Sequence, residues 1–176
     1  MSSTAARKNR PTRAPAPPLP PFESLDRTHR DVLAILERFD QLLDRVEREG
    51  SDEETRRTAT EIIDFFNGHA RQHHLAEEAT VFPALLESGD AELVQHVQRL
   101  RQDHGWLEED WIEIEPQLDA IAHGYVTVDL VMLRHSLPVY AELYREHIAL
   151  EESLIYPEAR RRLGLPAADS GSAPAA

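Results

Sequence analysis

The sequence predicts an all-α protein, an antiparallel up-down-up-down four-helix bundle with a pseudo-twofold internal repeat. Three observations support this prediction. Apolar residues recur at spacings of three and four along four long segments, almost nothing between positions 24 and 165 alternates as a strand does, and one His/Glu motif occurs in each half. A chain of 176 residues fits one domain, which we expect at 22–165, between a disordered, basic, proline-rich segment at 1–21 and a disordered segment at 166–176.

The first two helices are predicted from their stripes and their ends. We expect one helix at 24–49, because its apolar residues keep to a single stripe and Gly50 ends it. The sequence SDEE at 51–54 is typical of a capping box and places carboxylates at the positive end of a second helix. This second helix is expected to reach Pro83 or a little beyond.

Prolines mark the third and fourth helices. The third helix is expected at 91–115, after a turn at 88–90, and Pro116 ends or bends it. The fourth is expected at 128–163, with a bend near Pro138. The side chains of this helix that we expect to point inward are Tyr140, Leu143, Tyr144, Leu154 and Ile155.

The composition excludes several kinds of site. The chain has no cysteine, which rules out disulfides, cysteine zinc sites, iron–sulfur clusters and thiolate-bound haem. Its formal charge of −13 argues against general binding of nucleic acid, because an acidic surface repels phosphate. No stretch approaches the ~20 apolar residues of a membrane span, and none resembles a secretory signal, so we expect neither a membrane nor a nucleic-acid partner.

The second and fourth helices carry the same motif. Positions 73–83 read HHLAEEATVFP and positions 147–157 read HIALEESLIYP, so both follow H-x-x-x-E-E-x-x-x-aromatic-Pro. The first and third helices match more weakly, each with a lone histidine in a similar setting, His29 and His104. We therefore predict two helix pairs that face each other across a pseudo-twofold axis.

Helical periodicity points the motif residues inward. Because a helix turns by about 100° per residue, His73 and Glu77 lie within about 60° of Ile62, inside the apolar stripe. The same projection puts the other motif residues on inward faces. The predicted metal ligands are therefore His29, His73, Glu77, His104, His147 and Glu151.

A metal explains why two carboxylates can lie inside a bundle. Unpaired buried carboxylates are costly, and no lysine or arginine lies clearly on the inward faces. The i, i+4 spacing suits a terminal histidine and a glutamate that reaches between two metals. Two six-coordinate metals with a bridging oxo or hydroxo group then keep one open position each, which suits a diatomic ligand, peroxide or solvent.

Four further residues are weaker candidates for the site. Glu108 lies about 40° from His104 on the third helix and is expected to face inward. His69 lies in the stripe one turn before His73, while His74 and Glu78 repeat the i, i+4 spacing on the adjacent face. The aromatic residues of the stripes are expected to keep the site dry.

These motifs resemble the hemerythrin-like family, also called the HHE cation-binding domain, over roughly 24–163. The resemblance implies a bundle around a non-haem di-iron centre, with the four histidines as terminal ligands and the two glutamates as bridges. The chain departs from oxygen-carrying hemerythrins, which place a second histidine where Glu108 stands. Its four-histidine, two-glutamate set is more similar to di-iron proteins linked to nitrosative stress and iron-centre repair.

The leading hypothesis is a bacterial, cytoplasmic protein with two oxo- or hydroxo-bridged iron ions that binds O2, NO or a related small ligand for sensing, storage or stress protection. Imidazole and carboxylate also suit manganese and zinc. One alternative is a di-iron enzyme, such as a peroxidase or an NO-handling or repair catalyst, although a binding protein is favoured. A second is a metal-free helical interaction module. A ferritin-like oxidase is disfavoured, because those bundles use Glu-x-x-His.

Overall fold

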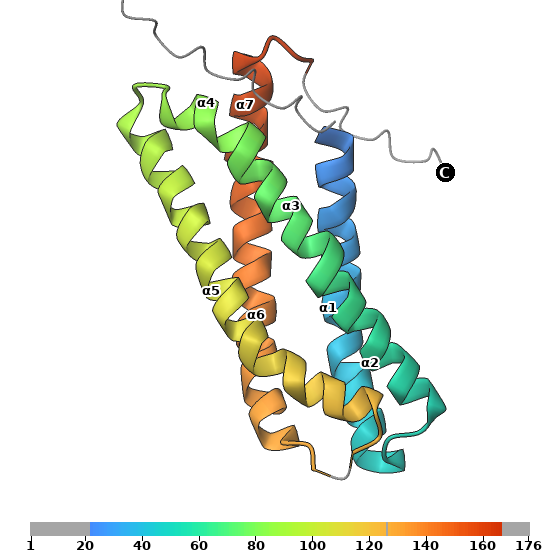
Figure 1. The fold of residues 1–176 in the computed structure, drawn as a ribbon. Helices are drawn as coiled ribbons and strands as arrows, with labels where there is room; N and C mark the ends of the chain where they lie inside the picture. The colour runs from blue at the N-terminus through green and yellow to red at the C-terminus, as the bar shows by residue number, and fades with distance from the viewer. Residues whose placement is uncertain (1–21, 126, 167–176) are drawn as a thin grey trace, which may run out of the picture.

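The computed structural model describes residues 22–125 and 127–166, and all of the regular structure in these ranges is helical. Figure 1 shows four rods side by side, with successive rods joined at opposite ends. The all-helical prediction is therefore confirmed for the described residues. The two segments predicted to be disordered lie outside them, apart from Pro166.

The first rod is α1 (Phe22–Glu49) and the third is α5 (Ala91–Ala122). The other two rods contain π-helical turns, which are labelled η. The second rod consists of α2 (Glu53–Phe65), η1 (Phe66–Ala70), α3 (Arg71–Ala76), η2 (Glu77–Val81) and α4 (Phe82–Leu86). The fourth rod consists of α6 (Leu130–Leu150), η3 (Glu151–Ile155) and α7 (Tyr156–Arg162).

Local side chains explain where the rods begin and end. Gly50 adopts a φ of 75°, a conformation that glycine accepts without strain, and α1 ends there. Asp52 accepts a hydrogen bond from the Thr55 backbone N–H at 2.8 Å and caps α2. Asp90 caps α5 in the same way. The third helix does not end at Pro116 but continues to Ala122, and Figure 1 shows that it bends in its C-terminal part.

In the fourth rod, a π-helical turn makes one side chain face a different way from the prediction. Leu154 was expected to point inward, but its side chain is 37% exposed, whereas Ile155 is fully buried. The turn η3 contains both residues, and a π-helix needs more residues per turn than an α-helix. The residues that follow Glu151 are therefore rotated backwards relative to an α-helical projection, which moves Leu154 off the inward face.

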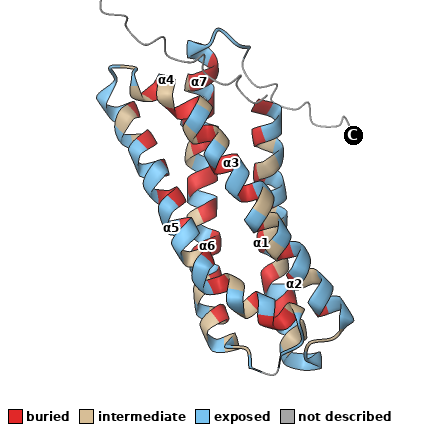
Figure 2. Ribbon diagram, in the orientation of Figure 1, coloured by how far each residue is buried: buried red, intermediate tan, exposed pale blue. Residues whose placement is uncertain are grey.

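Two apolar clusters fill the bundle, and a polar layer lies between them. One cluster contains Leu36, Phe39 and Tyr140, and the other contains Leu25 and Leu100. In Figure 2 the buried residues follow the inward faces of the rods. On α1 and α5 the histidines of the two predicted helix pairs stand between residues of the two clusters, so the polar layer is enclosed by apolar packing on both sides.

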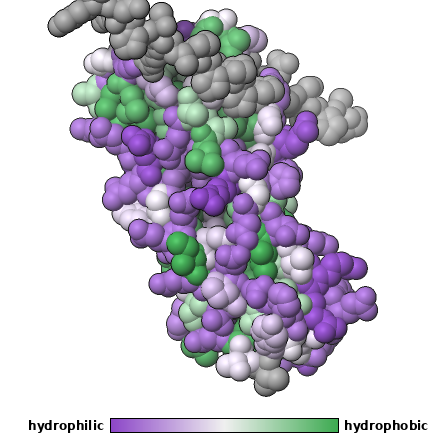
Figure 3. Space-filling model, in the orientation of Figure 1, coloured by the Kyte–Doolittle hydropathy of each residue, from purple (hydrophilic) through white to green (hydrophobic). Residues whose placement is uncertain are grey.

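The outward surface differs from this interior. The face in Figure 3 is largely hydrophilic, with separate hydrophobic patches. Within the described residues, none of the helices combines the length and the apolar character that a membrane crossing requires.

Candidate metal centre

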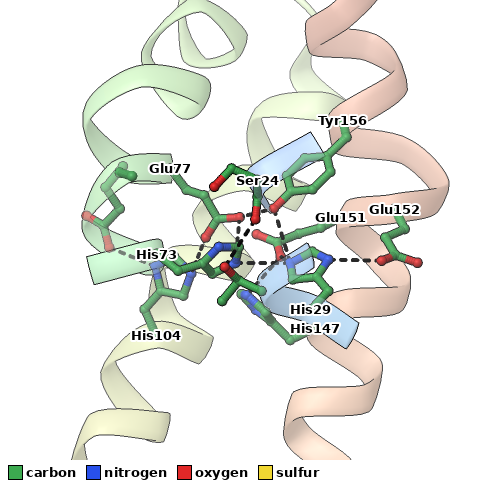
Figure 4. Close-up of polar contacts among 12 residues, drawn as sticks. Ser24, His29, His73, Glu77, His104, His147, Glu151, Glu152 and Tyr156 are labelled. Atoms are coloured by element: carbon green, nitrogen blue, oxygen red, sulfur yellow. Dashed lines mark hydrogen bonds and ion pairs between the residues drawn. The ribbon is translucent and has the colours of Figure 1, made fainter. Parts of the chain in front are cut away.

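All six predicted ligands lie in the polar layer of the bundle. Figure 4 shows His29, His73, Glu77, His104, His147 and Glu151 pointing toward one another from the four rods. Each of these side chains is at most 6% exposed. The structure thus brings together residues that are as much as 122 positions apart in the sequence, since His29 and Glu151 approach within 3.1 Å.

Four of the side chains form a first potential ligand group. The ligand atoms of His29, His73, Glu77 and Glu151 all lie within 4.8 Å of one another. His29 Nε2 is 3.0 Å from His73 Nε2 and 3.1 Å from Glu151 Oε2, and His73 Nε2 is 3.2 Å from Glu77 Oε1. Two ligands at about 2.1 Å from one ion and at right angles are about 3 Å apart, so these spacings suit a single metal.

The second potential group shares both glutamates with the first. Its members are Glu77, His104, His147 and Glu151, again within 4.8 Å of one another. Glu77 directs Oε1 at His73 and Oε2 at His104, which lies 3.6 Å away. Glu151 Oε2 is 3.1 Å from His29 Nε2 and 3.2 Å from His147 Nε2. Each carboxylate therefore faces both groups, as a bridging ligand does.

His74 joins the second group, although the helical projection put it at the edge of the stripe. Its ring is 8% exposed and stacks on His104 with the ring centres 4.1 Å apart. The ligand atoms of His74, His104 and His147 lie within 4.8 Å of one another. The π-helical turn η1 precedes His74 and rotates it inward relative to an α-helical projection from Ile62.

Carboxylates outside the cluster orient three of the histidines. His29 Nδ1 donates to Glu152 Oε1 at 3.0 Å, and His104 Nδ1 donates to Glu78 Oε1 at 2.9 Å. Asp103 Oδ2 lies 3.8 Å from His147 Nδ1 and is fully buried. An Nδ1–H held by a carboxylate leaves Nε2 free to bind metal, which is the usual arrangement around ligating histidines.

Sequence reasoning missed Glu152 and Asp103 and placed Glu78 only as a weak ligand candidate. The second glutamate of each E-E pair was the available signal, because Glu78 and Glu152 occupy equivalent positions and each contacts the lone histidine of the other half. Each motif therefore contributes one glutamate to the cluster and a second glutamate that orients a histidine.

Two of the weaker candidates lie away from the cluster. Glu108 was expected to face inward, but its side chain is 59% exposed and lies 3.4 Å from Arg71 on the surface. His69 is exposed and stacks on Phe65. His69 lies inside the π-helical turn η1, which displaces it from its place in an α-helical projection.

The charges of the cluster are unequal. Burial and the nearby charge of Glu151 raise the pKa of Glu77 to about 7. Burial lowers the pKa of His147, but Glu151 and Asp103 outweigh it and raise this pKa to about 10. Burial and the neighbouring histidines lower the pKa of His73 to about 3, and they hold the pKa of His74 well below its usual value. His73 and His74 are therefore neutral at pH 7, as a metal ligand must be.

The hydrogen bonding of the cluster is incomplete without a cation. Nine buried side-chain N and O atoms find no hydrogen-bond partner among the described residues, and all nine belong to five predicted ligands and Asp103. They include both oxygens of Glu151 and Nε2 of His104 and His147. Buried polar atoms without partners are costly, so the donor set fits one or two divalent or trivalent metal ions.

A surface pocket approaches each side of the cluster. One pocket, of about 220 Å³, has His74 and the aromatic side chains of Phe66, Trp111 and Tyr144 in its wall. The other, of about 590 Å³, has Tyr156 in its wall together with charged side chains, among them Arg160 and Glu152. The first pocket thus combines aromatic side chains with charged ones such as Arg71 and Glu108, whereas the second is bordered mainly by charged side chains.

Comparison with known proteins agrees with this geometry. The family model described as the hemerythrin HHE cation binding domain matches residues 21–159. An uncharacterized protein of Haemophilus influenzae is 28% identical over 135 residues, which cover 76% of each chain. No solved structure gives a significant match.

Proposed function

Because the chain belongs to the hemerythrin HHE cation-binding family, we propose that it is a non-haem di-iron protein that binds O2, NO or a related small ligand. The two potential ligand groups and their shared glutamates support two metal positions. The pseudo-twofold relation of the two helix pairs is part of the same proposal.

In this proposal His29 and His73 are the terminal ligands of one metal, and His104 and His147 are those of the other. Glu77 and Glu151 bridge the two metals. We add His74 to the second metal, because it lies within ligand distance of both histidines there. When bound, the metals would supply the chemistry that holds a small ligand, and the chain's two apolar clusters would enclose the site.

The single observation that carries the proposal is the shared position of Glu77 and Glu151. Both carboxylates are fully buried, and both belong to the two four-residue groups. A metal-free interaction module does not explain why both buried glutamates lie among four histidines, with nine buried polar atoms of the cluster lacking a hydrogen-bond partner in the described residues, so we disfavour it.

Metal analysis of aerobically purified protein tests the proposal. We expect about two iron ions per chain and an oxo-bridge absorption band in the near ultraviolet. His69→Leu is a matched control, because this histidine is exposed and outside the cluster. A protein that is isolated without metal and resists loading with iron, manganese or zinc would overturn the proposal.

Turnover separates a binding protein from an enzyme. A di-iron enzyme would consume peroxide or NO catalytically, and Glu77→Ala would abolish that turnover together with metal binding. We expect reversible ligand binding without such turnover. Stopped-flow measurements on the reduced and oxidised protein distinguish the two outcomes.

A further inference from the structure

The two motifs differ at one aromatic residue that touches the cluster. Phe82 and Tyr156 occupy equivalent positions, each directly before a proline. Phe82 stacks on His104 with ring centres 5.6 Å apart and planes at 15°, and Tyr156 stacks on His29 at 5.3 Å and 9°. The two rings therefore cover the two lone histidines in the same way, but only Tyr156 adds a hydroxyl group.

The hydroxyl of Tyr156 reaches the ligand atoms of the first metal position. It donates a hydrogen bond to Glu77 Oε1 and lies 3.1 Å from His29 Nε2. The side chain is 2% exposed, so water does not compete for this hydroxyl from the surface. Figure 4 shows the Tyr156 ring beside His29, with its hydroxyl directed at Glu77.

The second metal position differs in its number of histidines. His74 forms a group with His104 and His147, so three histidines gather on that side of the shared glutamates, whereas His29 and His73 are the two histidines on the other side. A metal held by two histidines would have fewer protein donors than one held by three, and would leave more room for a small ligand. The group with fewer histidines is the one beside the Tyr156 hydroxyl.

We propose that Tyr156 donates its phenolic hydrogen to a small ligand held at the His29–His73 metal position. This inference rests on the proposed di-metal function. A phenol has one hydrogen to donate, which Tyr156 gives to Glu77 when no ligand is bound. The best ligand is small and negatively charged or strongly polarised, since a hydrogen bond to charge is stronger than one to a neutral group.

The approach to Tyr156 supports this class of ligand. The pocket that has Tyr156 in its wall is bordered by Arg30, Arg160 and Arg161, although Asp26 and Glu152 also line it. The ring of Tyr156 separates this pocket from His29. The three arginines of this pocket therefore favour a small anion such as azide at the outer side of the Tyr156 ring.

Azide binding to the iron-loaded, oxidised full-length chain tests the role of Tyr156. The variant Tyr156→Phe keeps the ring and removes the hydroxyl, and Tyr140→Phe is the matched control, because it deletes a buried hydroxyl from the apolar core. We expect unchanged metal content in both variants. Azide affinity should fall about 10- to 100-fold in Tyr156→Phe and stay within about twofold of the wild type in Tyr140→Phe.

A vibrational measurement tests the same hydrogen bond without relying on azide affinity. The hydroxyl hydrogen exchanges with solvent, so the stretching frequency of bound azide should shift in deuterium oxide in the wild type and not in Tyr156→Phe. Equal azide affinity in wild type and Tyr156→Phe, or no isotope shift in the wild type, would overturn the role of Tyr156 alone. A wild-type chain that takes up no metal would instead overturn the proposed function.

Discussion

The His29–His73 half of the cluster and the His104–His147 half are alike in their ligands and unlike in their surroundings. Both share Glu77 and Glu151, and in both a second glutamate orients the lone histidine. Three of their differences lie beside the cluster: Tyr156 corresponds to Phe82, His74 corresponds to Ile148, and Asp103, which contacts His147, corresponds to Thr28. A repeated motif thus sets the common chemistry, and the few residues that differ around the cluster make the halves unequal.

The shared residues and the residues beside a single metal are under different constraints. A bridging carboxylate must face both metals, so any substitution of it affects both metal positions at once. The residues beside a single metal are free of that constraint and can differ. A substitution of a shared glutamate should therefore weaken metal binding in both halves. A substitution of a residue beside one metal should weaken metal binding in that half only.

The largest effect should follow from removing a shared carboxylate. In Glu77→Ala we expect metal content to fall from about two ions per chain to nearly none, because one change removes a ligand from both positions. Elemental analysis of the purified variant measures this. Glu142→Ala is the control, since this glutamate is exposed and contacts only Arg145 among its charged neighbours in the described residues. A variant that keeps one tightly held ion would break the idea that Glu77 is shared.

Removing His74 should affect one half only. We expect His74→Leu to weaken the second metal about 100-fold and to leave the first in place, because His74 lies in the group of His104 and His147 and outside that of His29. Titration of the metal-free variant with iron should then show one tight site and one weak site. Two sites of unchanged affinity would show that His74 only packs against the cluster.

The pH dependence of the metal-free protein should report on His147. Its pKa is raised to about 10 by Glu151 and Asp103 against the effect of burial, so its protonated form stabilises the fold below the unfolded-state pKa of 6.5. This stabilisation is lost as the pH rises from about 6.5 through 10, by a few kcal/mol. Urea unfolding of chelator-treated protein measures it, and His147→Leu should flatten the slope over this range.

The smallest expected effects concern the orienting carboxylates. Glu152→Gln and Glu78→Gln keep a side chain that can accept from Nδ1 but remove its charge, so each should weaken metal binding about 10-fold. Glu152→Gln should act on the first position and Glu78→Gln on the second. Competition with a metal-binding dye measures both. Equal loss at both positions in either variant would contradict the separation of the two halves.

Much of the fold could be predicted from local pattern. The stripes of α1 and α5 and the caps near Asp52 and Asp90 are properties of short segments, so the helices and their starts were predicted within a few residues. The family was predicted from the motifs and is confirmed. The face of Leu154 was predicted wrongly, because an α-helical projection ignores π-helical turns, and Glu108 was predicted to face inward but is exposed.

The sequence by itself determined that two H-x-x-x-E motifs and two lone histidines lie on helices, since helical periodicity depends only on neighbours along the chain. Only the tertiary structure decided that Glu77 faces both histidine pairs, that His74 turns inward, and that Tyr156 reaches Glu77. These relations depend on the rotation that π-helical turns impose and on the distances between packed rods. Neither quantity is encoded in the spacing of residues within one helix.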